Sequence, residues 1–177
     1  TSIPYVKTVT LSTTSYTYDG KVKKPSVTVK DNKGNKIASS NYIVTYQSGR
    51  KNVGKYSVKI TFKGNYSGTK TLYFTINPKG TSISSVTAKS KGFTVKWKKQ
   101  STQTTGYQIQ YSTSSKFTNA KTVTVSKNST TSKTISKLSA KKKYYIRVRT
   151  YKTVKVNGKS TKIYSSWSKA KYVTTKR

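Results

Sequence analysis

The chain has 177 residues and carries 37 Lys and Arg residues against two Asp and Glu residues, a formal net charge of +35 at pH 7. It contains no Cys and no His, which excludes disulfides, thiolate chemistry, a Ser-His-Asp triad and an ordinary zinc site. High charge favours disorder, but 15 Tyr, 4 Phe and 2 Trp recur at strand spacing and predict a folded chain.

The first half of the chain shows the two-residue alternation of β-strands and no helical periodicity. Its clearest strand runs from Tyr56 to Phe62, with an apolar or aromatic residue at every second position. Turn signals at Asp19-Gly20 and Asp31-Asn32-Lys33-Gly34 separate the other strands. These strands are expected around Val9 and Leu11; Tyr16 and Tyr18; Val27 and Val29; Tyr42, Val44 and Tyr46; and Leu72, Phe74 and Ile76.

Four glycine and aromatic motifs occur in order in this half. They are Tyr18-Asp19-Gly20, Asn52-Val53-Gly54-Lys55-Tyr56-Ser57-Val58, Gly64-Asn65-Tyr66-Ser67-Gly68 and Phe74-Thr75-Ile76. Together they resemble the YDG/MBG group of bacterial immunoglobulin-like modules over nearly all of residues 8–78. The resemblance implies a structural module of a bacterial surface or secreted protein, without catalytic residues.

The stretch Asn77-Pro78-Lys79-Gly80 is expected to end this first module. Proline cannot extend a β-ladder, and Pro-x-Gly is a typical loop sequence. We therefore expect one module over residues 1–79 and a second over residues 80–177.

The strand that organises the second module follows Lys141-Lys142-Lys143. Its inward face is predicted to hold Tyr144, Ile146, Val148 and Thr150, and its solvent face Tyr145, Arg147, Arg149 and Tyr151. Leu138 lies six residues before Tyr144, the spacing of a corner in which the tyrosine hydroxyl bonds back to the preceding loop. Asn157-Gly158 predicts a two-residue hairpin that extends the strand.

Further strands of this half are expected around Phe93, Val95 and Trp97; Tyr107, Ile109 and Tyr111; Val123 and Val125; Ile135 and Leu138; Ile163 and Tyr164; and Tyr172 and Val173. The aromatic residues Trp97, Tyr144 and Trp167 are predicted to lie in the core. The Trp97 strand, Gly106-Tyr107-Gln108-Ile109-Gln110-Tyr111, the Leu138 to Tyr144 spacing and Ser166-Trp167-Ser168 together resemble a fibronectin type III domain. The hairpin over residues 152–162 is longer than in many members. The predicted fold class is all-β, with two tandem immunoglobulin-like β-sandwich modules.

The sequence offers little for catalysis. The two acids, Asp19 and Asp31, both lie in turn signals, so no pair of carboxylates is placed to cleave a glycosidic bond. Calcium binding needs several carboxylates, and no apolar run is long enough to span a membrane. We therefore expect a chain that is not an enzyme, needs no cofactor, has no membrane span and is monomeric. The second half also lacks Asp, so it has no Arg-Gly-Asp tripeptide.

The charge is concentrated in the second half, which holds 23 Lys and Arg residues and no acid, against 14 and both acids in residues 1–79. Such a module attracts polyanions, and arginine can grip an oxyanion with two donors. The candidate polyanion-binding residues are Lys141, Lys142, Lys143, Tyr145, Arg147, Arg149, Tyr151, Lys152, Lys155, Lys159 and Lys162. Each lysine could instead be a solubilising surface residue.

These features lead to an adhesion or cell-wall role at a bacterial surface or in a secreted protein. The expected partners are teichoic acid, sulfated or sialylated glycans such as mucin, or DNA. Two alternatives stay open: a passive spacer that displays a neighbouring domain, and a module that binds a host receptor or immunoglobulin. Intracellular nucleic-acid binding is permitted by the charge, but neither module resembles a dedicated DNA or RNA reader.

Overall fold

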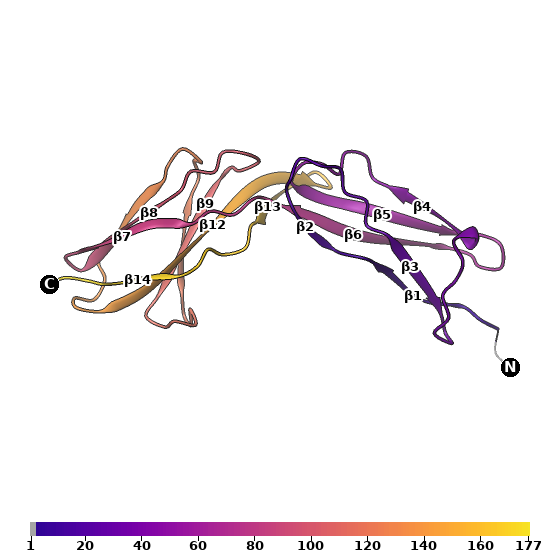
Figure 1. Ribbon diagram of the computed structural model, residues 1–177, viewed down its shortest axis with the longest axis horizontal. Coiled ribbons are helices and arrows are strands. Elements are labelled where there is room, and N and C mark those ends of the chain that lie inside the picture. Colours follow the sequence, from indigo (N-terminus) through magenta and orange to yellow (C-terminus); the bar gives the residue numbers. More distant parts are fainter. Residues whose placement is uncertain (1–2) are drawn as a thin grey trace. The chain divides into compact units, whose positions relative to one another are not determined.

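A computed structural model describes residues 3–177 and contains fourteen β-strands and one short 3₁₀ helix, η1 (Ser39–Asn41). The strands form two compact units, Thr1–Asn77 and Pro78–Arg177, each built from two sheets (Figure 1). The predicted all-β fold class, with two tandem β-sandwich units, is confirmed.

The first unit pairs β1 (Val6–Leu11) with β3 (Val27–Asp31) in a two-stranded antiparallel sheet. Its second sheet has the strand order β2 (Ser15–Thr17), β6 (Thr69–Asn77), β5 (Gly54–Phe62) and β4 (Tyr42–Tyr46). The short β2 runs parallel to β6, whereas the other neighbours are antiparallel.

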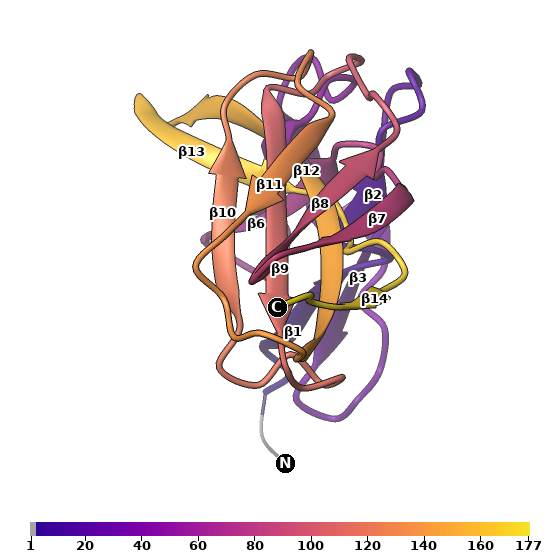
Figure 2. The ribbon, with the colours of Figure 1, turned by 90° about the vertical axis from the view of Figure 1, so that its left-hand side faces the viewer.

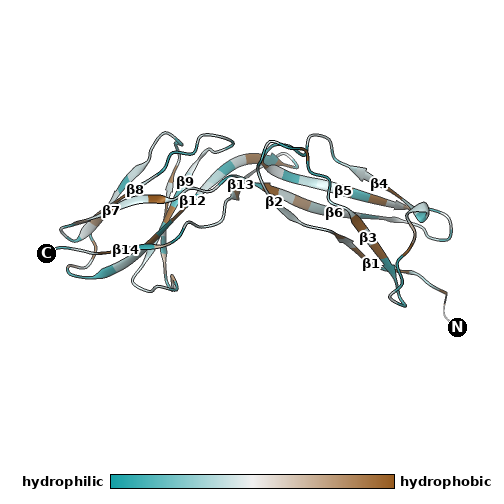
Figure 3. Ribbon diagram, viewed as in Figure 1, coloured by the Kyte–Doolittle hydropathy of each residue, from teal (hydrophilic) through white to brown (hydrophobic). Residues whose placement is uncertain are grey.

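The core of the first unit lies under β5 and β6, where Val58, Ile60, Phe74 and Ile76 are fully buried. The alternation of apolar and polar residues along both strands is visible in their hydropathy colouring (Figure 3). Because side chains of a strand point alternately to its two faces, every second residue enters the core. The strand predicted from Tyr56 to Phe62 is therefore confirmed.

Both acids of the chain serve turns, as predicted. The Asp31 carboxylate accepts hydrogen bonds from the backbone N–H groups of Lys33 and Asn35, each 2.9 Å long. The Asp19 carboxylate accepts from the backbone N–H of Lys21 at 2.9 Å and pairs with the Lys23 ammonium at 2.7 Å. The hydrogen bond from Lys23 is the main cause of the lowered pKa of Asp19.

The second unit is a sandwich of a three-stranded and a five-stranded sheet (Figure 2). The first sheet has the order β11 (Ser132–Ile135), β8 (Gly92–Trp97), β7 (Ile83–Lys89). The second has the order β10 (Lys121–Val125), β9 (Gly106–Ser112), β12 (Lys143–Val156), β13 (Lys159–Tyr164), and β14 (Lys171–Thr174) also pairs with β12. The 14-residue β12 is the longest strand of the described chain.

Two buried tyrosines anchor loops to the core of the second unit. The Tyr107 hydroxyl donates to the carbonyl of Asn128 at 2.7 Å and accepts from the backbone N–H of Gln100 at 2.8 Å. The Tyr144 hydroxyl accepts from the backbone N–H of Ser139 at 3.2 Å, which confirms the predicted tyrosine corner. Burial of each ring is thus combined with a satisfied hydroxyl.

The long hairpin of β12 and β13 closes at Asn157-Gly158, where φ is +51° and +76°. Positive φ at both central residues is the signature of a type I′ turn, whose twist matches that of the flanking strands. The predicted two-residue hairpin is confirmed.

The prediction that Tyr151 is exposed to solvent is wrong, because the residue is only 2% exposed. Its strand neighbour on β9 is Gly106, and the Tyr151 ring lies over this glycine. The Tyr164 ring, 6.2 Å away between centroids, and the Lys162 ammonium cover Tyr151 from the other side. A side chain on an outward position is therefore buried by its neighbours across the sheet.

We predict that Gly106→Ala destabilises the second unit by about 3 kcal/mol or more, the range of severe overpacking. A Cβ at this position would overlap the backbone carbonyl oxygen of Val125 and meet the Tyr151 hydroxyl at 3.0 Å. Gly80→Ala is the control, because its nearest neighbour, a Ser165 side-chain atom, would be 3.6 Å away. Both tryptophans lie in this unit, so urea unfolding followed by their fluorescence measures its stability. Equal stability of the two variants would contradict the account of Tyr151.

Candidate functional site

The candidate site lies on the outer face of the five-stranded sheet, along β12. The partner strand on one edge of β12 changes: β14 pairs with residues 143–146 and β13 with residues 151–156. Between them, the chain crosses from β13 to β14 alongside Val148 and Thr150. There the hydroxyls of Ser165 and Ser168 accept the backbone N–H groups of Thr150 and Val148, each at 3.0 Å.

These serine contacts hold Trp167 on the outer face of the sheet. The prediction of Trp167 as a core residue is wrong, since its side chain is half-buried and stacks on two guanidinium groups. The cause is the interrupted pairing of β12: regular strand alternation does not continue through the crossing segment. The other two aromatic residues assigned to the core, Trp97 and Tyr144, are buried as predicted.

Trp167 is the centre of a row of alternating aromatic and cationic groups that we call the ladder: Phe117, Arg147, Trp167, Arg149 and Tyr164. The Arg147 guanidinium carbon lies 4.1 Å from the Phe117 ring centroid and 4.6 Å from that of Trp167. The Arg149 carbon lies 3.8 Å from the Tyr164 ring and 4.2 Å from that of Trp167. Each guanidinium therefore lies against two aromatic rings.

Two glutamines of β9 accept hydrogen bonds from the guanidinium groups of these arginines. Arg147 Nε donates to Gln110 Oε1 at 2.7 Å, whereas Arg149 Nε and Nη2 both donate to Gln108 Oε1, at 3.0 and 2.8 Å. The Gln108 amide in turn donates to the Thr124 hydroxyl of β10 at 3.3 Å. The arginines are thus part of polar rows that cross three strands.

Burial among these rings lowers the pKa of both Arg147 and Arg149, and for Arg149 the nearby Arg147 cation lowers it further. The electrostatic interaction with Tyr164 raises the pKa of Arg149 and so partly opposes these effects. A cation–aromatic contact contributes about 0.5–1 kcal/mol at an exposed site and about 2 when desolvated. Partial desolvation also strengthens any contact that the outer edge of a guanidinium makes with an anion.

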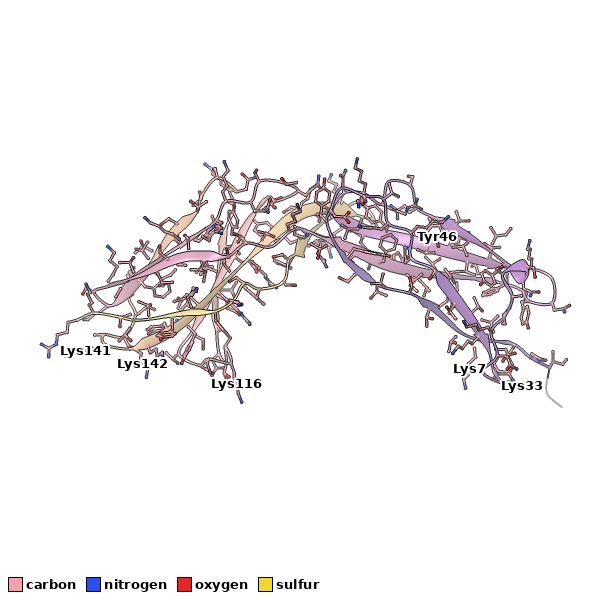
Figure 4. All side chains as sticks on the ribbon, in the orientation of Figure 1. Lys7, Lys33, Tyr46, Lys116, Lys141 and Lys142 are labelled. Atoms are coloured by element: carbon pink, nitrogen blue, oxygen red, sulfur yellow. The ribbon has the colours of Figure 1, made fainter. Side chains whose placement is uncertain are left out.

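The predicted residues at the start of β12 contact aromatic residues other than those of the ladder. The Lys143 ammonium lies 4.0 Å from the Tyr172 ring centroid and 5.3 Å from that of Tyr145. Lys141 and Lys142 are exposed in the preceding turn, at the end of the unit (Figure 4). Tyr172 is 65% exposed and offers an open ring surface.

The predicted residues of the hairpin lie toward the other end of β12. Lys155 is twelve residues beyond Lys143 on one strand, a separation of about 40 Å at about 3.3 Å per residue. Strand alternation places Lys152 on the opposite face from Arg149; its ammonium donates to Gln103, and burial lowers its pKa. Lys159 follows the hairpin turn, and the Lys162 ammonium lies 5.2 Å from the buried Tyr151 ring. The eleven predicted residues therefore extend along the whole length of β12 and the hairpin, and Lys152 lies on the opposite face from the arginines.

The structure joins Arg147 and Arg149 through Trp167 and places Lys143 against Tyr145, and it adds aromatic residues that sequence reasoning missed. For Trp167, the sequence signal that could have indicated a place outside the core was its position between two serines, because serines can interrupt a strand. Phe117 lies in a polar loop and has φ of +57°. An aromatic residue in such a loop indicates that its ring contacts a residue of another element. Within residues 3–177 no group of three His, Cys, Asp or Glu could hold a metal ion.

We predict that Trp167→Ala lowers the stability of the second unit by about 3 kcal/mol, because it removes a large ring and two cation–aromatic contacts. Tyr172→Ala, at an exposed ring, is the control and should cost less than about 1 kcal/mol. Urea unfolding followed by Trp97 fluorescence measures both. In addition, the NMR signals of the Nε protons of Arg147 and Arg149 should shift in the first variant alone. Unchanged Nε signals in Trp167→Ala would show that the ring does not stack on them.

The chain resembles solved structures of tandem modules. A crystal structure of the chicken CNTN1 FN1–FN3 domains has a TM-score of 0.49 and 20% identity, and the similarity covers 98% of this chain and 68% of that one. For domains A168–A170 from titin the TM-score is 0.37 and the identity 14%, with 99% and 68% covered. No curated protein matches the chain in sequence.

Residues 77–170 match the family model of the fibronectin type III domain. This region contains strands β7 to β13 and Trp167. Domains of this kind are typically non-catalytic and serve as spacers or binding modules. Since the match covers more than half of the chain, the protein belongs to the fibronectin type III family.

Proposed function

We propose that this chain is a non-enzymatic part of a bacterial surface or secreted protein that binds anionic polymers through its fibronectin type III unit. The YDG/MBG-like motifs of residues 8–78 support the bacterial setting and the assignment of the first unit to that group. Within residues 3–177, no helix is long and apolar enough to cross a membrane.

The observation that carries the proposal is the lack of internal charge pairing. Within residues 3–177 there is one ion pair, between Lys23 and Asp19, and it lies in the first unit. The 23 cations of residues 80–177 have no acidic side chain in their own unit to neutralise them. Their field attracts polyanions, and the release of condensed counterions drives the binding.

The ladder adds to this positive potential two ordered arginine cations on the outer face of β12. The rings and glutamines order the arginines without cancelling their charge. The side chains therefore lose their conformational entropy on folding and lose little more on binding. Arg147 donates through Nε, and its two terminal nitrogens have no hydrogen-bond partner within the described residues. They can hold a phosphate, sulfate or carboxylate by two parallel bonds. Lys143, Lys142 and Lys141 continue the cationic path toward the start of the strand.

The test compares three double variants that each remove two exposed charges. Lys141→Gln/Lys142→Gln lies in the turn before β12, Lys155→Gln/Lys159→Gln lies in the hairpin, and Lys21→Gln/Lys33→Gln in the first unit is the control. Affinity for duplex DNA, heparan sulfate and teichoic acid is measured from about 50 to 300 mM salt. We expect the first variant alone to lose affinity, with the salt slope on DNA falling by about 0.9 for each lost contact.

Equal losses for all three variants would indicate a diffuse electrostatic anchor and would refute the ladder as a site. No binding by the unmodified chain at about 150 mM salt would refute polyanion binding and support the passive spacer. Loss in the hairpin variant alone would move the site to β12 and β13 beyond Tyr151. Comparison of the three polymers then identifies the preferred anion.

A further inference from the structure

The first unit has two open strand edges on the same side of its sandwich. On β6, the short β2 pairs with residues 75–77 only, so the edge from Thr69 to Phe74 has no hydrogen-bonded strand beside it, and its neighbour is β1 of the other sheet. The edge of β1 that faces away from β3 is open as well. Edge strands of this kind are templates for the addition of another strand.

The unpaired backbone groups of β6 can be identified. The Thr75 N–H donates to the carbonyl of Thr14 at 2.9 Å and therefore points away from β5. The pairing of β5 with β6 runs from Thr69 to Ile76 without a register shift. Because the direction of backbone groups repeats every two residues, the N–H and C=O groups of Thr71 and Tyr73 also point away from β5. Within the described residues, they have no backbone partner.

Two hollows lie between β1 and this edge and share Val9 and Thr10. The smaller, of about 310 Å³, has an apolar lining that includes Leu11 and Leu72. The larger, of about 480 Å³, has Lys7 and Lys70 in its lining, and Figure 4 shows Lys7 at the start of β1. Lys70 and Leu72 are two residues apart on β6 and point to the same face.

We propose that an acidic, extended segment of another protein adds to β6 as an antiparallel strand along residues 69–74. Its backbone pairs with Thr71 and Tyr73. An apolar side chain enters the smaller hollow beside Leu72, and an acidic side chain two residues later enters the larger hollow beside Lys70. We therefore expect β6 to recognise the sequence apolar-x-acidic, written from the N-terminus to the C-terminus of the added strand.

The positive charge of this edge favours the binding of an acidic segment and disfavours the binding of a second copy of this chain. Every copy carries a net charge of +35, and its two carboxylates are engaged in turns. An inward-pointing lysine at an edge strand opposes pairing with another cationic strand, because the added strand would bury like charges together. Lys7 and Lys70 would instead form ion pairs with an incoming carboxylate.

The experiment uses the complete chain and a synthetic peptide, Thr-Thr-Val-Thr-Glu-Thr-Thr, at about 150 mM salt, where diffuse attraction is screened. Two control peptides exchange Val and Glu, or replace Glu by Lys. Binding is followed through backbone amide NMR signals of the labelled protein. We expect the first peptide to shift amides of β1 and β6 and to protect those of Thr71 and Tyr73 from exchange. We expect at least about tenfold weaker binding of both controls.

Protein variants test the backbone contact directly. Thr71→Pro removes the N–H that points away from β5 and so keeps the pairing with β5, whereas Thr71→Val keeps the donor. We expect Thr71→Pro to weaken binding about tenfold or more and Thr71→Val less than about twofold. Lys70→Glu should reverse the preference between the Glu and Lys peptides. This variant keeps the proposal testable if Thr71→Pro does not fold.

Amide shifts spread over both units, equal binding of all peptides, or no binding would each overturn the proposal. Shifts of β6 amides that increase with protein concentration, without peptide, would show self-association of this edge and would overturn the choice of occupant. Because the probed residues lie in the first unit, the outcome is independent of polyanion binding by the second.

Discussion

Aromatic rings take the place of carboxylates as partners of the cations in this protein, and the rest of its surface depends on that exchange. Residues 3–177 contain eleven cation–aromatic contacts and one ion pair. An ion pair orders a cation and cancels its charge, whereas a ring orders the cation and leaves its charge intact. The chain can therefore be well ordered and still expose nearly all of its positive charge.

Folding with this charge is physically reasonable because the cations are spread over a large surface. The described chain exposes 10592 Å², or roughly 300 Å² for each unit of net charge, which gives a mean spacing of about 17 Å. The Debye length at physiological salt is about 8 Å, so average neighbours are screened. The ladder is the exception, since Trp167 separates two guanidinium groups by a single ring. The rings and glutamines offset that local repulsion.

The sequence predicted those features that depend on local alternation and turn chemistry. The strand from Tyr56 to Phe62, the corner at Tyr144 and the turn at Asn157-Gly158 are examples. It could not predict features that depend on residues distant in the chain. Tyr151 is buried because Gly106, on another strand, leaves room for its ring. Trp167 lies outside because serine hydroxyls replace regular strand pairing. The candidate site was predicted around Arg147 and the hairpin, and the structure adds Phe117, Trp167 and Tyr164 to it.

The geometry of the ladder also bears on the kind of polymer it suits. Readers of single-stranded nucleic acid stack bases on open aromatic faces or on guanidinium planes. Here Arg147 and Arg149 each lie against two rings, and Trp167 lies against both arginines. A base that stacked on these groups would compete with the existing contacts, whereas the terminal nitrogens of Arg147 have no hydrogen-bond partner within the described residues. For the polyanion binding that we propose, this arrangement favours a polymer whose repeating anionic groups lie on its outside, such as a phosphate-linked or sulfated chain, over one recognised through its bases.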